Sequence, residues 1–185
     1  MELTPMDPNL LPPIAHASAE DVPLPHPSTF KAVRNQDNLT RPAHGLWCSP
    51  ITTWSSEGAP TGTAWTDWTA TPDDVTGQPS QYHDPNAQFT AVEPLPHAQI
   101  YLLKTADDLD RLVAAFPLPP DHQMRSTAPN WEAMAMAVAG WDAVYASKAG
   151  LAANAERFLA VEPSLYGWEC PSVLWLRPAY RLTAR

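Results

Sequence analysis

Apolar and polar residues alternate or group along this chain in patterns that predict short strands. Thr29–Arg34 alternates apolar and polar positions, which is typical of a strand with one buried face. Continuous apolar runs bounded by turn-forming residues indicate further, more deeply buried strands. These strands are expected at 46–49, near 89–92, at 98–103, at 141–146 and at 172–176.

Helical spacing is clearest between Thr105 and Pro117. Thr105 with Asp108 has the form of a capping box, and Pro117 ends the segment. Between them an apolar stripe recurs at i, i+3, i+4 and i+7, as on a helix with one buried face. The stripe consists of Leu109, Leu112, Val113 and Phe116. Shorter helices are expected at 63–69, from Asn130 to about 138, and at 147–160.

Proline separates the first part of the chain from the rest. Seven of the 22 prolines precede Ser28, where large side chains are few. Proline has no backbone N–H and favours extended chain, so residues 1–28 are expected to form a flexible arm. The remainder, 29–185, mixes strands, short helices and long loops, and is expected to be a single globular α+β domain.

The stretch His44–Pro50 is the most conspicuous candidate for a functional site in the sequence. Gly45 allows an unusual turn, residues 46–48 suit a buried strand, and Pro50 is expected to end that strand. Ser49 would then lie at the strand end, where polar side chains commonly meet ligands. Four of the eight tryptophans fall within residues 47–68. Such density predicts either an unusual core or an aromatic wall for a ligand.

Charge and cysteine content narrow the class of protein. The 20 acidic and 11 basic residues give a net charge of −9, which disfavours generic binding to nucleic-acid backbones or anionic membranes. The two cysteines, Cys48 and Cys170, form no disulfide framework. The sequence has no signal-peptide pattern and no apolar run long enough for a membrane span. A soluble cytoplasmic protein is expected.

Familiar catalytic and metal-binding motifs are missing from the sequence. It has no Gly-rich phosphate loop, no His-Glu-x-x-His and no Cys-x-x-Cys, and His83–Asp84 alone is too little to hold a metal. No metal site is therefore expected. Two roles are open for Cys48. It is either a nucleophile or an inert core residue, and a cysteine among apolar neighbours is more often inert.

Three polar residues flank predicted strands: Arg34, Ser49 and Glu169. In this order they resemble the Arg-Ser-Glu signature of the ADP-ribosyltransferase fold. The resemblance implies two small, mostly antiparallel sheets with short flanking helices and long loops, gripping NAD in a cleft. The chain would be a mono-ADP-ribosyltransferase that uses NAD as substrate and transfers ADP-ribose to an unknown protein or nucleic-acid acceptor.

The resemblance also implies roles for particular residues. Arg34 would contact a phosphate or ribose of NAD, and Ser49 would support the nicotinamide ribose. Glu169 would stabilise the positive charge that develops on that ribose, which is where a fixed carboxylate helps most. The residues expected to contact NAD are Arg34, His44, Gly45, Trp47, Ser49 and Trp65.

Two other classes of function stay open at this stage. A non-enzymatic interaction protein, such as a virion-associated or accessory factor, would account for the proline-rich arm and the surplus of aromatic residues. A carbohydrate or small-ligand binder would use the tryptophans as stacking platforms. Incubation with NAD separates these classes, because only an enzyme of the transferase type releases nicotinamide.

Overall fold

The computed structural model describes residues 3–19, 22, 26–138, 140–155, 157–160 and 162–183. Within these residues the fold mixes strands with short helices, as the α+β prediction required. The strands are β1 (Ile14–Ser18), β2 (Arg34–Gln36), β3 (Leu39–Ala43), β4 (Leu46–Trp54), β5 (Pro60–Thr63), β6 (Gln88–Pro94), β7 (Ile100–Leu103), β8 (Ala143–Ala146), β9 (Ser172–Trp175) and β10 (Tyr180–Thr183). The helices are α1 (Ala64–Ala70), α2 (Ala106–Ala115), α3 (Trp131–Met136) and α4 (Lys148–Asn154), with 3₁₀ turns at Pro8–Leu10, Pro27–Thr29 and Arg157–Ala160.

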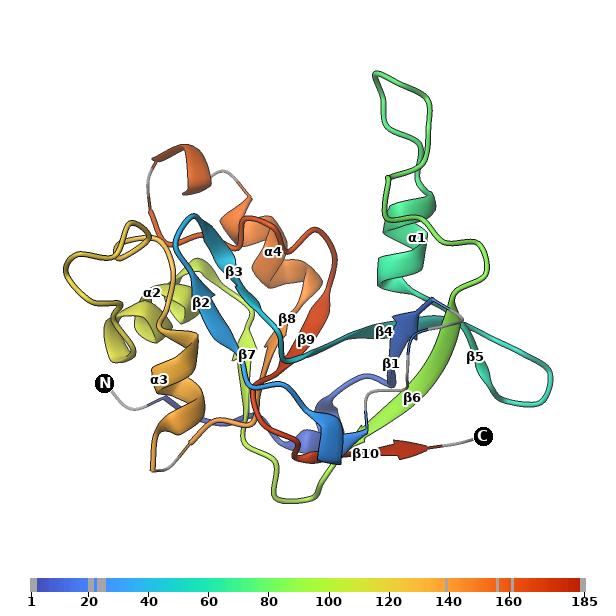
Figure 1. Cartoon of the computed structure of the whole chain (residues 1–185), viewed down its shortest axis with the longest axis horizontal. Coiled ribbons are helices and arrows are strands. Elements are labelled where there is room, and N and C mark those ends of the chain that lie inside the picture. The colour runs from blue at the N-terminus through green and yellow to red at the C-terminus, as the bar shows by residue number, and fades with distance from the viewer. Residues whose placement is uncertain are drawn as a thin grey trace.

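The long strand β4 joins two halves of the main sheet. In the described residues the sheet order is β10-β6-β1-β4-β9-β8-β7, with β5 paired to the far end of β4. Only β7 and β8 pair in parallel there, so the sheet is mostly antiparallel as predicted. The hairpin of β2 and β3 forms a separate two-stranded sheet. Figure 1 shows β4 crossing the molecule between α2 and α3 on one side and α1 on the other.

Side chains on the two faces of β7–β9 enter different cores, because successive residues of a strand point to opposite faces. Leu174 packs under α2 and α3 with Leu109, Leu112 and Trp131. Its neighbours Val173 and Trp175 enter the second core, on the other face of the sheet. That second core also takes apolar side chains from β1, β4, β6, β7 and β10. β1 and β4 therefore belong to the hydrophobic interior of the protein.

The prediction of a flexible arm over residues 1–28 is wrong for much of that segment. β1 pairs with β4 on one edge and with β6 along its whole length on the other. Ile14 and Ala15 are each only 1% exposed, and Met6 bridges to Ile100 at the edge of β7. None of the prolines lies within β1 itself, so they remove none of its ladder bonds.

The predicted strand at 29–34 is also wrong, because a 3₁₀ turn covers Pro27–Thr29 and the strand starts only at Arg34. Pro50 does not end β4, which continues to Trp54. β4 pairs with β9 as far as Cys48 and with β5 from Ile51 onwards. Pro50 lies between these pairings, so its missing N–H costs no ladder bond on that edge. Ser49 consequently lies within the strand and not at its end.

The helices follow their sequence signals closely. Thr105 caps α2 with the reciprocal Asp108 bond of a capping box, and Leu109 and Leu112 are fully buried. Thr63 caps α1 in the same way with Thr66, and Asn130 caps α3. The predicted helix over 147–160 is shorter, because α4 ends at Asn154 and a 3₁₀ turn follows.

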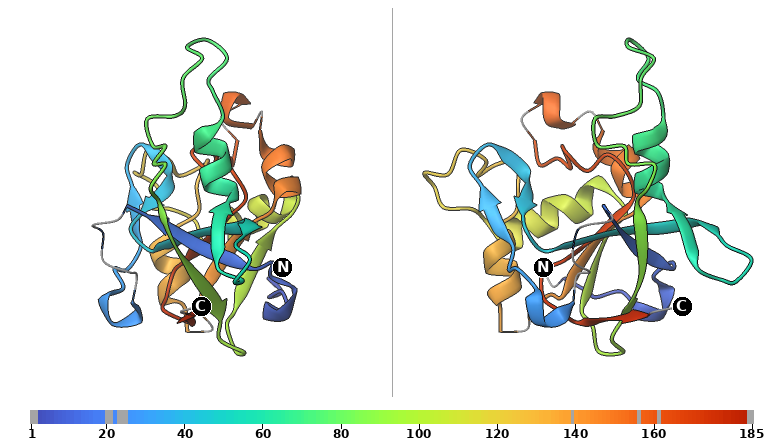
Figure 2. Two further views of the ribbon diagram at one scale, coloured as in Figure 1. Left: turned by 90° about the vertical axis from the view of Figure 1, so that its right-hand side faces the viewer. Right: turned by 45° about the vertical axis from the view of Figure 1, so that its right-hand side comes forward.

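The connection after α1 projects from the body of the molecule (Figure 2). It is held by its own turn bonds, from the Asp73 N–H to the Gln78 carbonyl and from the Gly77 N–H to the Asp73 carbonyl. No helix within the described ranges has the length and apolar character needed to cross a membrane.

Candidate functional site

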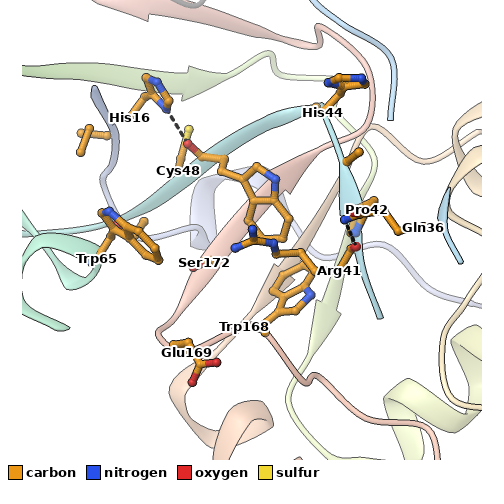
Figure 3. A pocket seen from close by; sticks show the side chains of 17 residues that line it. His16, Gln36, Arg41, Pro42, His44, Cys48, Trp65, Trp168, Glu169 and Ser172 are labelled. Atoms are coloured by element: carbon orange, nitrogen blue, oxygen red, sulfur yellow. Dashed lines mark hydrogen bonds between the residues drawn. The ribbon is translucent and has the colours of Figure 1, made fainter. Parts of the chain in front are cut away.

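A pocket of about 530 Å³ lies beside β1 and β4, under the β2–β3 hairpin and next to the start of α1. The segment that leads into β9 closes it with Trp168 and Glu169. Figure 3 shows these side chains around the pocket. Segments from both ends of the chain meet here, so the pocket is a product of tertiary packing.

Most of the predicted site residues line this one pocket. Ser49 and Glu169 both line it, although 120 positions of chain numbering separate them, and four of the residues expected to contact NAD join them. These four are His44, Gly45, Trp47 and Trp65.

Arg34 does not line the pocket and is wrongly placed by the sequence argument. The strand that was expected to end at Arg34 does not form, and Arg34 instead opens β2 as an exposed residue. The hairpin that it begins carries another arginine, Arg41, into the pocket wall. The guanidinium carbon of Arg41 lies 5.7 Å from the centre of the Trp47 ring, a cation–π contact.

Ser49 connects β4 to the first turn of α1. Its Oγ accepts a hydrogen bond from the Trp65 backbone N–H at 3.2 Å, which satisfies one of the free donors at the helix start. Ser49 lies opposite Ala15 of β1 and is 3% exposed. The hydroxyl thereby fixes Trp65 at the pocket wall, and its own proton stays available as a donor.

His16, on β1, is a pocket residue that the sequence argument missed. Its Nδ1 lies 2.7 Å from the Trp47 carbonyl oxygen. A carbonyl only accepts, so Nδ1 carries the proton and the neutral ring keeps its lone pair on Nε2. Burial lowers the pKa of His16, against the opposing effect of the Trp47 hydrogen bond. The ring is therefore a neutral acceptor at physiological pH.

Three tryptophans form a continuous aromatic wall behind the pocket. The Trp47 and Trp168 rings meet edge to face at 4.7 Å, and Trp168 stacks on Trp131 at 5.8 Å. Trp131 is a core residue whose Nε1 donates to the Thr40 carbonyl. Buried Trp168 has no partner for its Nε1 among the described residues. The tryptophans thus serve both as core and as pocket wall.

The backbone at the pocket rim adopts a conformation that most residues avoid. His44 and Gly45 have consecutive positive φ angles of 62° and 73°. For Gly45 no other residue fits, because a Cβ would lie 2.7 Å from the Trp175 carbonyl oxygen and 2.8 Å from side chains of Leu174 and Val33. Non-glycine residues such as His44 adopt this region at a cost, and such strain clusters at functional sites.

Cys48 contacts the pocket, but its environment does not suit a nucleophile. It is 3% exposed in the second core, and burial raises the pKa of its thiol well above the usual range. Since the thiolate is the reactive form, this cysteine is inert at neutral pH. Cys170 is a buried free thiol as well, and burial likewise raises its pKa.

The pocket combines aromatic rings with one cationic and one anionic side chain. Arg41 and Glu169 are the ionic side chains lining the pocket, and both are exposed. In the described part of the chain, no three His, Cys, Asp or Glu residues are grouped so as to hold a metal ion.

Comparisons with models of protein families, with curated proteins and with solved structures found no match for this chain.

The sequence carries only weak signals for His16 and Arg41, the two pocket residues discussed above that were not predicted. Ile14–Ser18 is a short run of small residues with one histidine, a pattern without strong strand propensity. Arg41 stands beside a proline in a segment that looks like a connection. Only the pairing of β1 with β4 brings His16 and Ser49 to the same pocket.

Proposed function

We propose that this pocket binds NAD and that the protein cleaves the bond between nicotinamide and its ribose. ADP-ribose then passes to a protein, nucleic-acid or water acceptor. The observation that carries the proposal is the meeting of Ser49, Glu169, Trp47 and Trp65 in one pocket from separate parts of the chain. Its volume of about 530 Å³ lies within the usual range for small-molecule sites.

Glu169 supplies the negative charge that the reaction requires. As the glycosidic bond breaks, its electron pair moves to the nicotinamide nitrogen, and positive charge develops on the ribose. A carboxylate fixed beside that ribose stabilises the transition state more than the ground state. The acceptor then bonds to the ribose carbon and releases a proton.

The other pocket residues bind and orient the substrate. Trp47 and Trp65 offer aromatic surfaces to a cationic pyridinium ring. Arg41 takes the phosphate-binding role that Arg34 was expected to have, since a guanidinium fork matches phosphate oxygens. Neutral His16 accepts a hydrogen bond from a ligand hydroxyl through Nε2. Ser49 holds the start of α1 and positions Trp65.

The test is incubation of the full chain with NAD, followed by chromatography of nicotinamide and ADP-ribose. We expect nicotinamide release with water as acceptor, and NAD binding detectable by tryptophan fluorescence. Glu169→Gln keeps the shape and removes the charge, so turnover should fall by about a hundredfold or more. Circular dichroism checks that the variant is folded.

A matched pair of arginine variants tests the assignment of the phosphate contact. Arg41→Ala should raise KM for NAD by about tenfold, because charge-assisted hydrogen bonds to phosphate are lost. Arg34→Ala removes the same charge from a side chain outside the pocket. If the wild-type chain neither binds NAD nor releases nicotinamide, the proposal is wrong and the non-enzymatic interaction protein becomes the better hypothesis.

A further inference from the structure

A second, smaller cavity of about 180 Å³ adjoins the first pocket. Among the described residues the two share Ala17 and Trp65, so Trp65 contributes to the lining of both. The end of β1, the α1 residues Thr66 and Thr69, and the segment before β6 complete the smaller cavity. The cavity is therefore a second hollow next to the first pocket, and Trp65 belongs to both.

Aromatic rings dominate one side of this cavity. The centres of the Trp65 and Tyr82 rings lie 6.2 Å apart and the rings are inclined by 42°, and the Trp68 ring contacts Trp65 with its centre 5.1 Å away. Ring faces of tryptophan and tyrosine attract cations through their quadrupole. Clusters of aromatic rings are a known means by which proteins bind quaternary ammonium groups.

The carboxylate of Asp84 lies at the same cavity and has no ionic partner. Its Oδ1 accepts the Asn86 backbone N–H at 2.9 Å, and no ion pair of Asp84 is found in the described ranges. No Lys or Arg in the described part of the chain lines the cavity, and the sequence contains none between Arg41 and Lys104. A half-buried carboxylate without a counter-charge is favourable only if solvent or a cationic ligand compensates it.

From these walls we infer that the smaller cavity binds an organic cation, with an ammonium or guanidinium group between Trp65 and Tyr82 and against Asp84. The volume of about 180 Å³ suits such a small group and is below the usual size of a nucleotide site. The cation belongs either to a free small molecule or to a lysine or arginine side chain of a peptide. The site does not depend on the reaction proposed for the large pocket.

The experiment is a titration of the full chain in the absence of NAD, followed by the indole N–H signals in NMR spectra. The probes are tetramethylammonium and methylguanidinium, with tert-butanol and methylurea as neutral analogues of similar shape. Sodium chloride at equal ionic strength corrects for salt. We expect saturable shifts of a tryptophan indole signal with the cations and none with the neutral analogues. Short peptides containing one arginine or lysine distinguish a side-chain ligand from a free one by binding more tightly than the free cations.

Two variants assign the site. Asp84→Asn retains an oxygen for the Asn86 N–H and removes the charge, so cation affinity should fall by about tenfold. Tyr82→Leu removes one aromatic wall and should weaken binding by about threefold or more. Asp74→Asn is the matched control, since it removes one acidic charge from the projecting connection outside the cavity. Binding of the neutral analogues as tight as that of the cations, or equal affinity in Asp84→Asn and wild type, would overturn the inference.

Discussion

Two regions of this protein are held together in different ways. In the helical half, β7 to β9 with α2 and α3, each helix begins at a capping residue and buries an apolar stripe that the sequence displays. In the pocket half, β1, the β2–β3 hairpin, β4 and α1, segments distant in sequence pair side by side. Local sequence signals therefore build the scaffold, whereas long-range strand pairing builds the pocket.

The largest effect should follow from removing β1. Deletion of residues 1–19 takes away a strand bonded on both edges and buried at Ile14 and Ala15. Because β6 and β4 lose their shared partner, we expect loss of cooperative thermal unfolding. Shortening the projecting connection within 74–77 is the control, since those residues are exposed. A deletion variant that melts within a few degrees of the full chain would show that the pocket half does not need β1.

The helical half can be tested at Leu112, which is fully buried beneath α2. Leu112→Ala should lower the free energy of unfolding by about 2–5 kcal/mol, as other large-to-small core changes do. Ala114→Ser on the exposed side of α2 should change it by no more than about 0.5 kcal/mol. Urea denaturation measures both. Equal stabilities would mean that the predicted stripe is not a core contact.

A pair of glycines separates backbone conformation from close packing in the pocket half. Gly58 and Gly45 both have positive φ, but a Cβ at Gly58 would meet no atom of the described residues within 4 Å. Gly58→Ala should therefore cost about 1–2 kcal/mol for conformation alone. Gly45→Ala adds the clash with the Trp175 carbonyl, so its cost should exceed that of Gly58→Ala by about 1–3 kcal/mol. Similar costs in denaturant would contradict the close approach of β4 to β9 at this turn.

The smallest effect concerns the pH dependence of stability through His16. Burial lowers its pKa in the folded state, so the unfolded chain binds the proton more readily. The contribution of His16 to the free energy of unfolding is then fully present above the unfolded pKa of about 6.5. It is lost as pH falls through the lower pKa of the folded state. His16→Asn should flatten the change in unfolding free energy between about pH 7 and pH 5. An unchanged slope would mean that other groups dominate that range.

Sequence reasoning was most successful where one segment carries its own evidence. The α2 stripe with its Thr105 cap, the short helix near 63–69 and the β4 start at Leu46 were all predicted and are confirmed. Pro50 was predicted to end its strand, but β4 continues past it. A proline interrupts a strand only on an edge where its missing N–H would have bonded to a paired neighbour. β1 was missed because its stability comes from partners elsewhere in the chain.

The same distinction applies to the pocket. Ser49, Trp47 and Trp65 were predicted because they lie in one conspicuous stretch, and Glu169 because it precedes an apolar strand. The prediction of Arg34 depended on a strand boundary, which sequence patterns locate poorly, and Arg41 was not among the predicted residues. His16 could not be assigned from sequence, since only the register of Ala15 with Ser49 brings it beside Trp47.

The position of β1 in the sheet has a consequence for synthesis of the chain on the ribosome. β1 is made first, yet its longest pairing is with β6, which emerges only after β2 to β5 and α1. Until then β1 can form only its short pairing with β4, and its edge toward β6 has no ladder partner. An unpaired edge is the condition under which nascent strands associate with other chains. Trp168 and Glu169 emerge later still, so a ribosome that stalls before them leaves a chain with the sheet partly paired and the pocket without its acidic wall.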